Sequence, residues 1–274
     1  SNMALLSILG IILSNSDKLF IANLLSLRDI GLYTLAFNLS TLPIMICQII
    51  SVSSYPKIIE EVENFQALSF SKFYQGLNTL MATILIPLCL TLTFFNYHIS
   101  YAWIGDMEIS RDVYFYAVIL VAAQTIQGST MIAYYFALSR QVTLPQIVIA
   151  LFSAVILLPV MYFSIIKYEL LGASLVVFFC ILISYPFGVI FLNRNKQKVS
   201  LYKHSVIPYL STFLVLLPLF YLLSLIPYNP FESRFLNLLI IAIIFLLGTS
   251  LATAKNYIHI KDYLAPLKYV LKKY

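Results

Sequence analysis

The sequence PQIVIALFSAVILLPVMYFSI occupies residues 145–165, and LLGASLVVFFCILISYPFGVIFL follows at residues 170–192. Neither run contains a charged residue. Each is about as long as the ~20 residues that a helix needs to cross a ~30 Å hydrocarbon core. Because lipid offers the backbone no hydrogen-bond partner, continuous apolar runs of this length indicate membrane-spanning helices. These two segments therefore predict an all-α membrane protein.

Six further runs pass a hydropathy window of about 19 residues. The composition agrees, because 61% of the 274 residues are hydrophobic and 10% are charged, whereas soluble domains are roughly 25% charged. This excludes an ordinary soluble enzyme, a nucleic-acid-binding domain and a disordered protein. We predict a polytopic transmembrane helix bundle with eight spans, at 3–24, 32–53, 76–96, 113–137, 145–165, 170–192, 205–226 and 234–254.

Lysine and arginine predict the orientation of these spans. With the N-terminus inside, the inner loops and the tail hold twelve of the 17 basic residues, the outer loops hold four, and Lys18 lies within the first span. Such an excess marks the cytoplasmic side, so we expect both ends of this chain to be cytoplasmic. The tail beyond residue 255 carries an apolar stripe flanked by lysines. It predicts a basic amphipathic helix on the anionic inner leaflet.

The first span contains the polar sequence Asn15-Ser16-Asp17-Lys18. Charges inside a membrane cost a few kcal/mol each and usually face a wet cavity or a partner. Asp17 and Lys18 are therefore the leading candidates for a transport cavity, with Asn15 beside them. Two alternatives stay open: Lys18 could snorkel toward a headgroup, and Asp17 could cap a broken helix.

Uncharged polar residues recur in two further spans. Asn38, Thr41 and Gln48 recur at helical spacing in the second span, and Gln124 and Gln127 are i, i+3 neighbours in the fourth. Such side chains either line a polar path or hold helices together by hydrogen bonds. From the residues alone, both interpretations stay open.

Catalytic and metal-binding motifs are absent from the sequence. The three cysteines lie in apolar runs, the three histidines lie at or beyond span ends, and no Gly-rich phosphate loop or HExxH motif occurs. We expect no enzyme and no cofactor. A membrane enzyme stays an alternative. Its only candidate cluster is on the outer loop after the third span, at Asp106, Glu108, Arg111 and Asp112.

A series of short motifs follows the chain over roughly residues 12–195. They are, in order, Asn15-Ser16-Asp17-Lys18-Leu19-Phe20-Ile21, Gly31-Leu32-Tyr33, Pro56, Trp103-Ile104-Gly105, Leu138-Ser139-Arg140, Gly172-Ala173 and Asn193-Arg194. Through these motifs the chain resembles polysaccharide-biosynthesis (Wzx-type) O-antigen flippases of the multidrug/oligosaccharidyl-lipid/polysaccharide exporter superfamily, in their C-terminal lobe. The family pattern is a buried Asp followed by Gly-x-Tyr entering the next helix. The last 80 or so residues carry no matching motif.

This resemblance implies one lobe of a two-lobe, alternating-access transporter. Residues 1–195 would form a six-helix lobe, and residues 196–274 two additional helices and the basic tail. The cargo would be a lipid-linked oligosaccharide of the bacterial inner membrane, and the partners would be membrane lipid and a missing N-terminal lobe, with no nucleic acid. Lys18 or Arg28 would hold the pyrophosphate, and amide side chains would meet the sugar hydroxyls. Asp17 would pair with a base or bind a coupling proton or sodium ion. The alternatives are a drug or metabolite exporter of the same superfamily, a membrane enzyme acting on lipid-linked sugars, and a non-catalytic membrane scaffold.

Overall fold

The computed structural model describes residues 2–63, 67–140, 144–193, 201–225 and 234–271, and every element in these segments is an α-helix. The helices are α1 (Asn2–Leu24), α2 (Leu27–Ser40), α3 (Leu42–Glu63), α4 (Ala67–Phe94), α5 (Asn96–Ile104), α6 (Met107–Ser129), α7 (Met131–Ser139), α8 (Leu144–Asn193), α9 (Leu201–Ser224) and α10 (Arg234–Leu271).

Within the described residues, six helical segments are long and apolar enough to cross a membrane. They are Leu42–Glu63, Ser71–Phe94, Met107–Ser139, Ala150–Tyr185, Ser205–Ser224 and Asn237–Tyr257. The chain is therefore all-helical and compatible with a multi-pass membrane protein, as the composition predicts. The predicted number of eight spans is not confirmed by this criterion. The helix α1 is not among the six, and the two runs at 145–165 and 170–192 join into one segment.

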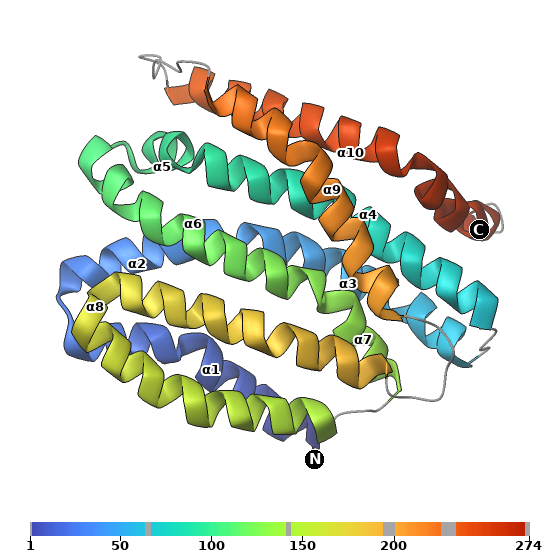
Figure 1. Cartoon of the computed structure of the whole chain (residues 1–274), viewed down its shortest axis with the longest axis horizontal. Coiled ribbons are helices and arrows are strands. Elements are labelled where there is room, and N and C mark those ends of the chain that lie inside the picture. The colour runs from blue at the N-terminus through green and yellow to red at the C-terminus, as the bar shows by residue number, and fades with distance from the viewer. Residues whose placement is uncertain (1, 64–66, 141–143, 194–200, 226–233, 272–274) are drawn as a thin grey trace.

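A tight turn at Glu169 divides α8 into two arms that lie side by side (Figure 1). Glu169 has φ 51° and ψ −133°, a backbone conformation that a residue with a Cβ rarely adopts. At Gly172 an added Cβ would overlap the carbonyl oxygen of Ser164 on the other arm. The absence of a side chain at Gly172 therefore allows the two arms to approach this closely at the turn.

Two helix boundaries differ from the predicted spans. The second span, expected at 32–53, is interrupted at Thr41 and continues as α3 to Glu63, with Pro56 inside the helix. The interruption precedes Pro43, which has no amide hydrogen to continue the α2 ladder. A short helix, α5, also fills part of an expected outer loop. It ends at Gly105, whose φ of 83° suits a residue without a Cβ.

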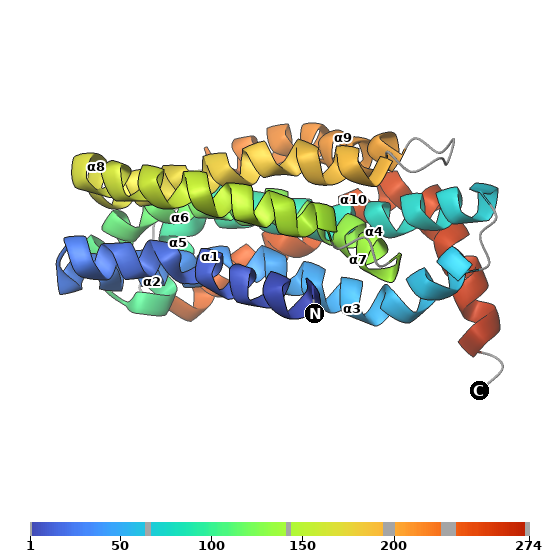
Figure 2. The same ribbon diagram turned by 90° about the horizontal axis from the view of Figure 1, so that it is seen from below.

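The helices run along the long axis of the molecule and form two main layers (Figures 1 and 2). In Figure 2 the helices α1, α2 and α3 lie in one layer, and α8 and α9 lie on the opposite side. Consecutive helices turn alternately at the two ends. One end holds the α1–α2 link, the α5–α6 link and the junction of the two α8 arms, and the other holds the ends of α3 and α7 (Figure 1).

Two large hydrophobic cores and a small cluster of Cys89, Leu92 and Val121 hold this bundle together. The first includes Ile21 of α1, Leu32 of α2, Leu120 of α6 and Met161 of α8. The second joins α3, α4 and α7 to α9 and α10. The helix α4 is the most enclosed of the candidate spans, because 72% of the residues in its apolar stretch are buried. The last two helices thus share a core with α4. The predicted domain boundary at 195/196 lies outside the described residues and stays a prediction, and α10 extends through the predicted tail helix to Leu271.

Candidate functional site

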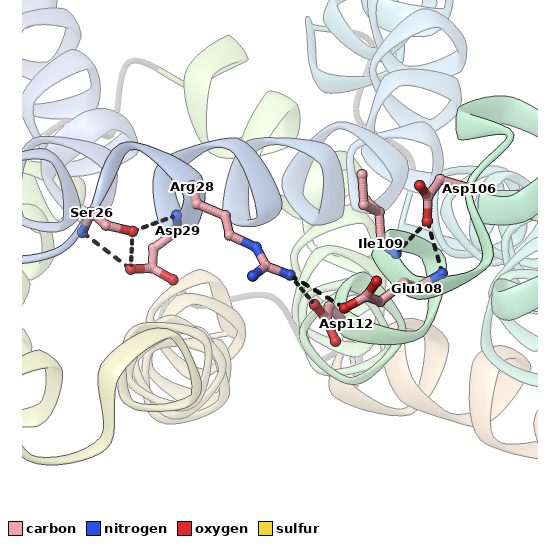
Figure 3. A network of polar contacts seen from close by, with 7 residues as sticks. All are labelled: Ser26, Arg28, Asp29, Asp106, Glu108, Ile109 and Asp112. Carbon is pink, nitrogen blue, oxygen red and sulfur yellow. Dashed lines mark hydrogen bonds and ion pairs between the residues drawn. The ribbon is translucent and has the colours of Figure 1, made fainter.

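The site begins with the hairpin that α1 and α2 form. Ser26 caps α2: its Oγ accepts a hydrogen bond from the Asp29 amide at 3.3 Å. The Asp29 carboxylate in turn accepts one from the Ser26 amide at 3.1 Å. Figure 3 shows both contacts. This reciprocal capping box satisfies amides at the start of α2. It fixes where the chain reverses, and so which residues of α1 face α2.

Asp17 and Tyr33 form the buried polar contact of this hairpin. The Tyr33 hydroxyl donates to Oδ2 of Asp17 at 2.7 Å, and the Lys18 amide donates to Oδ1 at 2.8 Å. Asp17 is 3% exposed and Tyr33 is 1% exposed. Each carboxylate oxygen therefore has one donor in a place that water scarcely reaches, which partly offsets the loss of hydration.

Tyr33 was not among the predicted site residues, although the sequence contains a signal for it. Residues equally distant from the turn of an antiparallel hairpin lie opposite each other. Asp17 is eight residues before Leu25 and Tyr33 is eight residues after it. This symmetry identifies the partner of Asp17 once the turn has been located from the capping box.

Lys18 points to α2 separately from Asp17. Its Nζ lies 3.8 Å from the centroid of the Phe37 ring, and this ring stacks on Tyr33 with centroids 6.4 Å apart. In the described part of the chain no carboxylate oxygen lies within 4.0 Å of Lys18 Nζ. Neighbouring residues of a helix point about 100° apart. Lys18 is thus a cation held by an aromatic face rather than the ion-pair partner of Asp17.

Among the residues whose burial is described, the exposed amide side chains lie on the α1–α3 layer. Asn15, Asn38 and Gln48 are exposed, as is Asn23, which the sequence prediction omitted. Asn15 and Asn23 each donate to a carbonyl of their own helix, at 2.9 and 2.7 Å. Thr41 is half-buried and donates to the Asn38 carbonyl at 2.8 Å.

The apolar surface of α8 and α9 provides the contrast. Between residues 147 and 166 of α8, every side chain described as exposed is aliphatic or aromatic, and the same holds between residues 205 and 225 of α9. Lipid can cover such a surface but cannot satisfy an exposed amide. The α1–α3 layer also exposes aliphatic side chains such as Ile11, Leu19 and Ile49. This mixture of amide and aliphatic groups is suited to face another protein, whereas α8 and α9 are suited to face lipid.

The glutamines of α6 do not join this layer. Gln124 is 6% exposed and Gln127 is half-buried. Among the described residues, no hydrogen bond links either side chain to Asp17, Lys18 or Gln48. The structure brings Asp17 and Lys18 together with Tyr33 and Phe37, and it leaves the two glutamines inside the packing of α6.

Arg28 lies at the end of the molecule, where it links α2 to α6. Its guanidinium donates to Oδ2 of Asp112 at 3.2 Å and lies 4.0 Å from Oε1 of Glu108 (Figure 3). Its side chain is 66% exposed. An exposed pair of this kind contributes about 0–1 kcal/mol. The positive charge of Arg28 is already shared with two carboxylates, in contrast to that of Lys18.

A search of the described residues finds no group of three or more His, Cys, Asp or Glu side chains that could hold a metal ion. Comparisons with models of protein families, with curated proteins and with solved structures found no match. The candidate site therefore rests on the residues and geometry described above.

Proposed function

We propose that this chain is one lobe of an alternating-access flippase that moves a lipid-linked oligosaccharide across the bacterial inner membrane. In this proposal the chain crosses the membrane eight times: α1, α2 with α3, α4, α6 with α7, each arm of α8, α9 and α10. The alternation of helix ends in Figure 1 supports this count. Both chain ends face the cytoplasm, in keeping with the distribution of lysine and arginine.

One observation carries the proposal: the exposed amides of α1–α3 lie in the same layer of helices as the cation Lys18 and the buried acid Asp17 of α1. Amides are suited to sugar hydroxyls, and a cation without a carboxylate partner is suited to a phosphate. Transporters built from repeated lobes bind their cargo between the lobes. The exposed α1–α3 layer would meet a second, N-terminal lobe across such a cavity, while the apolar surfaces of α8 and α9 meet lipid.

The proposed mechanism gives each group one task. Lys18 exchanges its contact with the Phe37 ring for a contact with the pyrophosphate of the cargo. Asn15, Asn38 and Gln48 donate to and accept from sugar hydroxyls. Asp17, held by Tyr33, binds the coupling proton or sodium ion, and its change of charge alters how α1 packs on α2. Arg28 stays with Asp112 and holds α2 to α6 while the lobe moves as a body.

The test uses a bacterium that lacks its own flippase and makes the matching sugar repeat. The chain is supplied with its upstream coding region, and surface polysaccharide is measured at equal membrane abundance. We expect Asp17→Asn and Lys18→Gln to abolish most of the surface polysaccharide. The matched controls are Glu63→Gln and Lys72→Gln, which remove exposed charges away from the α1–α2 hairpin, and these should keep it.

Wild-type amounts of polysaccharide from both Asp17→Asn and Lys18→Gln would refute the proposed site. Rescue by this chain without the upstream region would show that two copies build the cavity, and would refute the need for an N-terminal lobe. Resistance to a drug, without rescue of polysaccharide in a matched host, would favour an exporter with a different cargo.

A further inference from the structure

Lys255 lies at the end of the apolar stretch of α10, and its ammonium contacts α9. Residues 235–254 contain no charge, so Lys255 is the first charged residue after that run. Its Nζ donates to Oγ of Ser211 at 2.8 Å and lies 3.4 Å from Oγ1 of Thr212. Helical side chains tilt toward the N-terminus of their helix. The ammonium is accordingly directed back along the apolar part of α10.

A buried polar chain fixes the position of these hydroxyls. Nδ2 of Asn256 donates to Oγ1 of Thr212 at 3.2 Å and to Oγ1 of Thr83 on α4 at 3.1 Å. Thr212, Asn256 and Thr83 are 0%, 5% and 1% exposed. The three helices are thereby held in register at this level, and the α9 hydroxyl beside Lys255 cannot move away without breaking buried hydrogen bonds.

The positive charge of Lys255 is not neutralised by this arrangement. Its contacts in the described part of the chain are hydroxyl groups, and no carboxylate oxygen lies within 4.0 Å of its Nζ. An ammonium carries three donors, and only two are engaged. Lys255 is itself exposed, so an anion from outside the chain can reach the third donor.

The surface beside Lys255 is apolar on both helices. Leu247 and Leu251 lie two turns and one turn before Lys255 on α10, and Leu214 lies one turn after Ser211 on α9; their exposed fractions are 53%, 48% and 59%. A ligand at this place would meet a cation and a hydroxyl next to exposed hydrocarbon. A phospholipid has this combination, with an anionic phosphate attached to acyl chains.

We propose that Lys255 and Ser211 form a binding site for the phosphate of an anionic phospholipid from the surrounding bilayer, with the acyl chains along Leu214, Leu247 and Leu251. The site lies between α9 and α10 and involves neither Asp17 nor Lys18. Lipid binding at this site can therefore be tested without the transported cargo.

The experiment measures lipid retained by the purified 274-residue chain with native mass spectrometry. The chain is solubilised with either phosphatidylglycerol or phosphatidylcholine at equal mole fraction. We expect one phosphatidylglycerol to be retained in preference to phosphatidylcholine, and Lys255→Gln to weaken its binding about fivefold, which corresponds to about 1 kcal/mol. Lys255→Arg keeps the charge and should keep the lipid.

Lys72→Gln is the matched control, because it removes another exposed lysine outside the α9–α10 contact. Ser211→Ala is a second variant that leaves every charge in place, and it should weaken binding less than Lys255→Gln does. All variants are first compared with the wild type by helical circular dichroism and gel filtration. An excess of inorganic phosphate is added in a separate arm and should leave the lipid bound.

Three results would overturn the inference. The first is equal phosphatidylglycerol retention by the wild type, by Lys255→Gln and by Ser211→Ala. The second is a loss in Lys72→Gln as large as that in Lys255→Gln, because general attraction to positive charge would then explain the binding. The third is displacement of the lipid by inorganic phosphate, which would make the site one for a free anion.

Discussion

Replacement of Gly172 by alanine tests the close contact between the two arms of α8. A Cβ at this position would overlap the Ser164 carbonyl oxygen and lie 2.7 Å from the carbonyl carbon and 3.2 Å from the Ser164 Cβ. The atoms in the way belong mainly to the backbone, so no side-chain rotation relieves the overlap. The arms would have to separate by about 1 Å next to the turn, against buried packing at Ile165 and Leu170.

Inserting a methyl group into a well-packed place costs about 1–3 kcal/mol. For a chain of this size, that lowers the midpoint of thermal unfolding by about 2–10 °C. The midpoint is measured by circular dichroism of the purified chain in detergent. The control is Gly10→Ala, because Gly10 lies in α1 with no atom within 4 Å of an added Cβ.

Alanine is favoured over glycine in a helix by about 0.8–1.0 kcal/mol, so Gly10→Ala should leave the midpoint unchanged or raise it. An unfolding midpoint of Gly172→Ala equal to that of the wild type would contradict a close contact between the two arms. An equal loss in both alanine variants would also contradict it, since the loss would then come from glycine replacement in general.

Two further changes test the turn and the C-terminal packing. Glu169→Gly should raise the free energy of unfolding by about 1 kcal/mol, because glycine adopts φ 51° and ψ −133° without the Cβ penalty. An unchanged or lower unfolding midpoint would contradict the strain assigned to Glu169. Asn256→Ala removes the donor shared by Thr83 and Thr212 and should cost about 1–3 kcal/mol. Its control is Asn23→Ala, which changes an exposed side chain and should alter the free energy of unfolding by no more than about 0.5 kcal/mol. Equal unfolding midpoints for the two variants would contradict the role given to the buried hydrogen bonds.

The regions of disagreement between sequence and structure have physical causes. The window that defines a span averages hydropathy over about 19 residues, so it does not register the break at Thr41 inside the expected span 32–53. The turn at Glu169 is a different case, because it lies in the link 166–169 that separates the two predicted runs, where Lys167 and Glu169 interrupt the apolar sequence. The short helix α5 lies in a segment that was expected to be an outer loop, because the third predicted span ends at residue 96. The role of Gly105 as its left-handed C-cap becomes evident only with the backbone dihedral angles.

The candidate site was predicted in part. Asp17 and Lys18 can be found from the sequence because a charge inside an apolar run is costly wherever the run is packed. Asp17 contacts Tyr33, whereas Lys18 contacts the Phe37 ring. These different partners depend on how α1 is rotated against α2. Lys255 was counted only as a cytoplasmic basic residue, because its contact with Ser211 joins residues 44 positions apart in the chain.

The amino-acid sequence alone predicts that this protein is helical and rich in apolar segments long enough to cross a membrane. That follows from local physics, because a backbone in lipid must satisfy its own hydrogen bonds whatever surrounds it. Which polar groups meet is set by the fold: Arg28 pairs with Asp112, and Asn256 joins Thr83 to Thr212. Those contacts depend on how helices distant in sequence are placed and rotated against one another, which the hydropathy of a single segment does not encode.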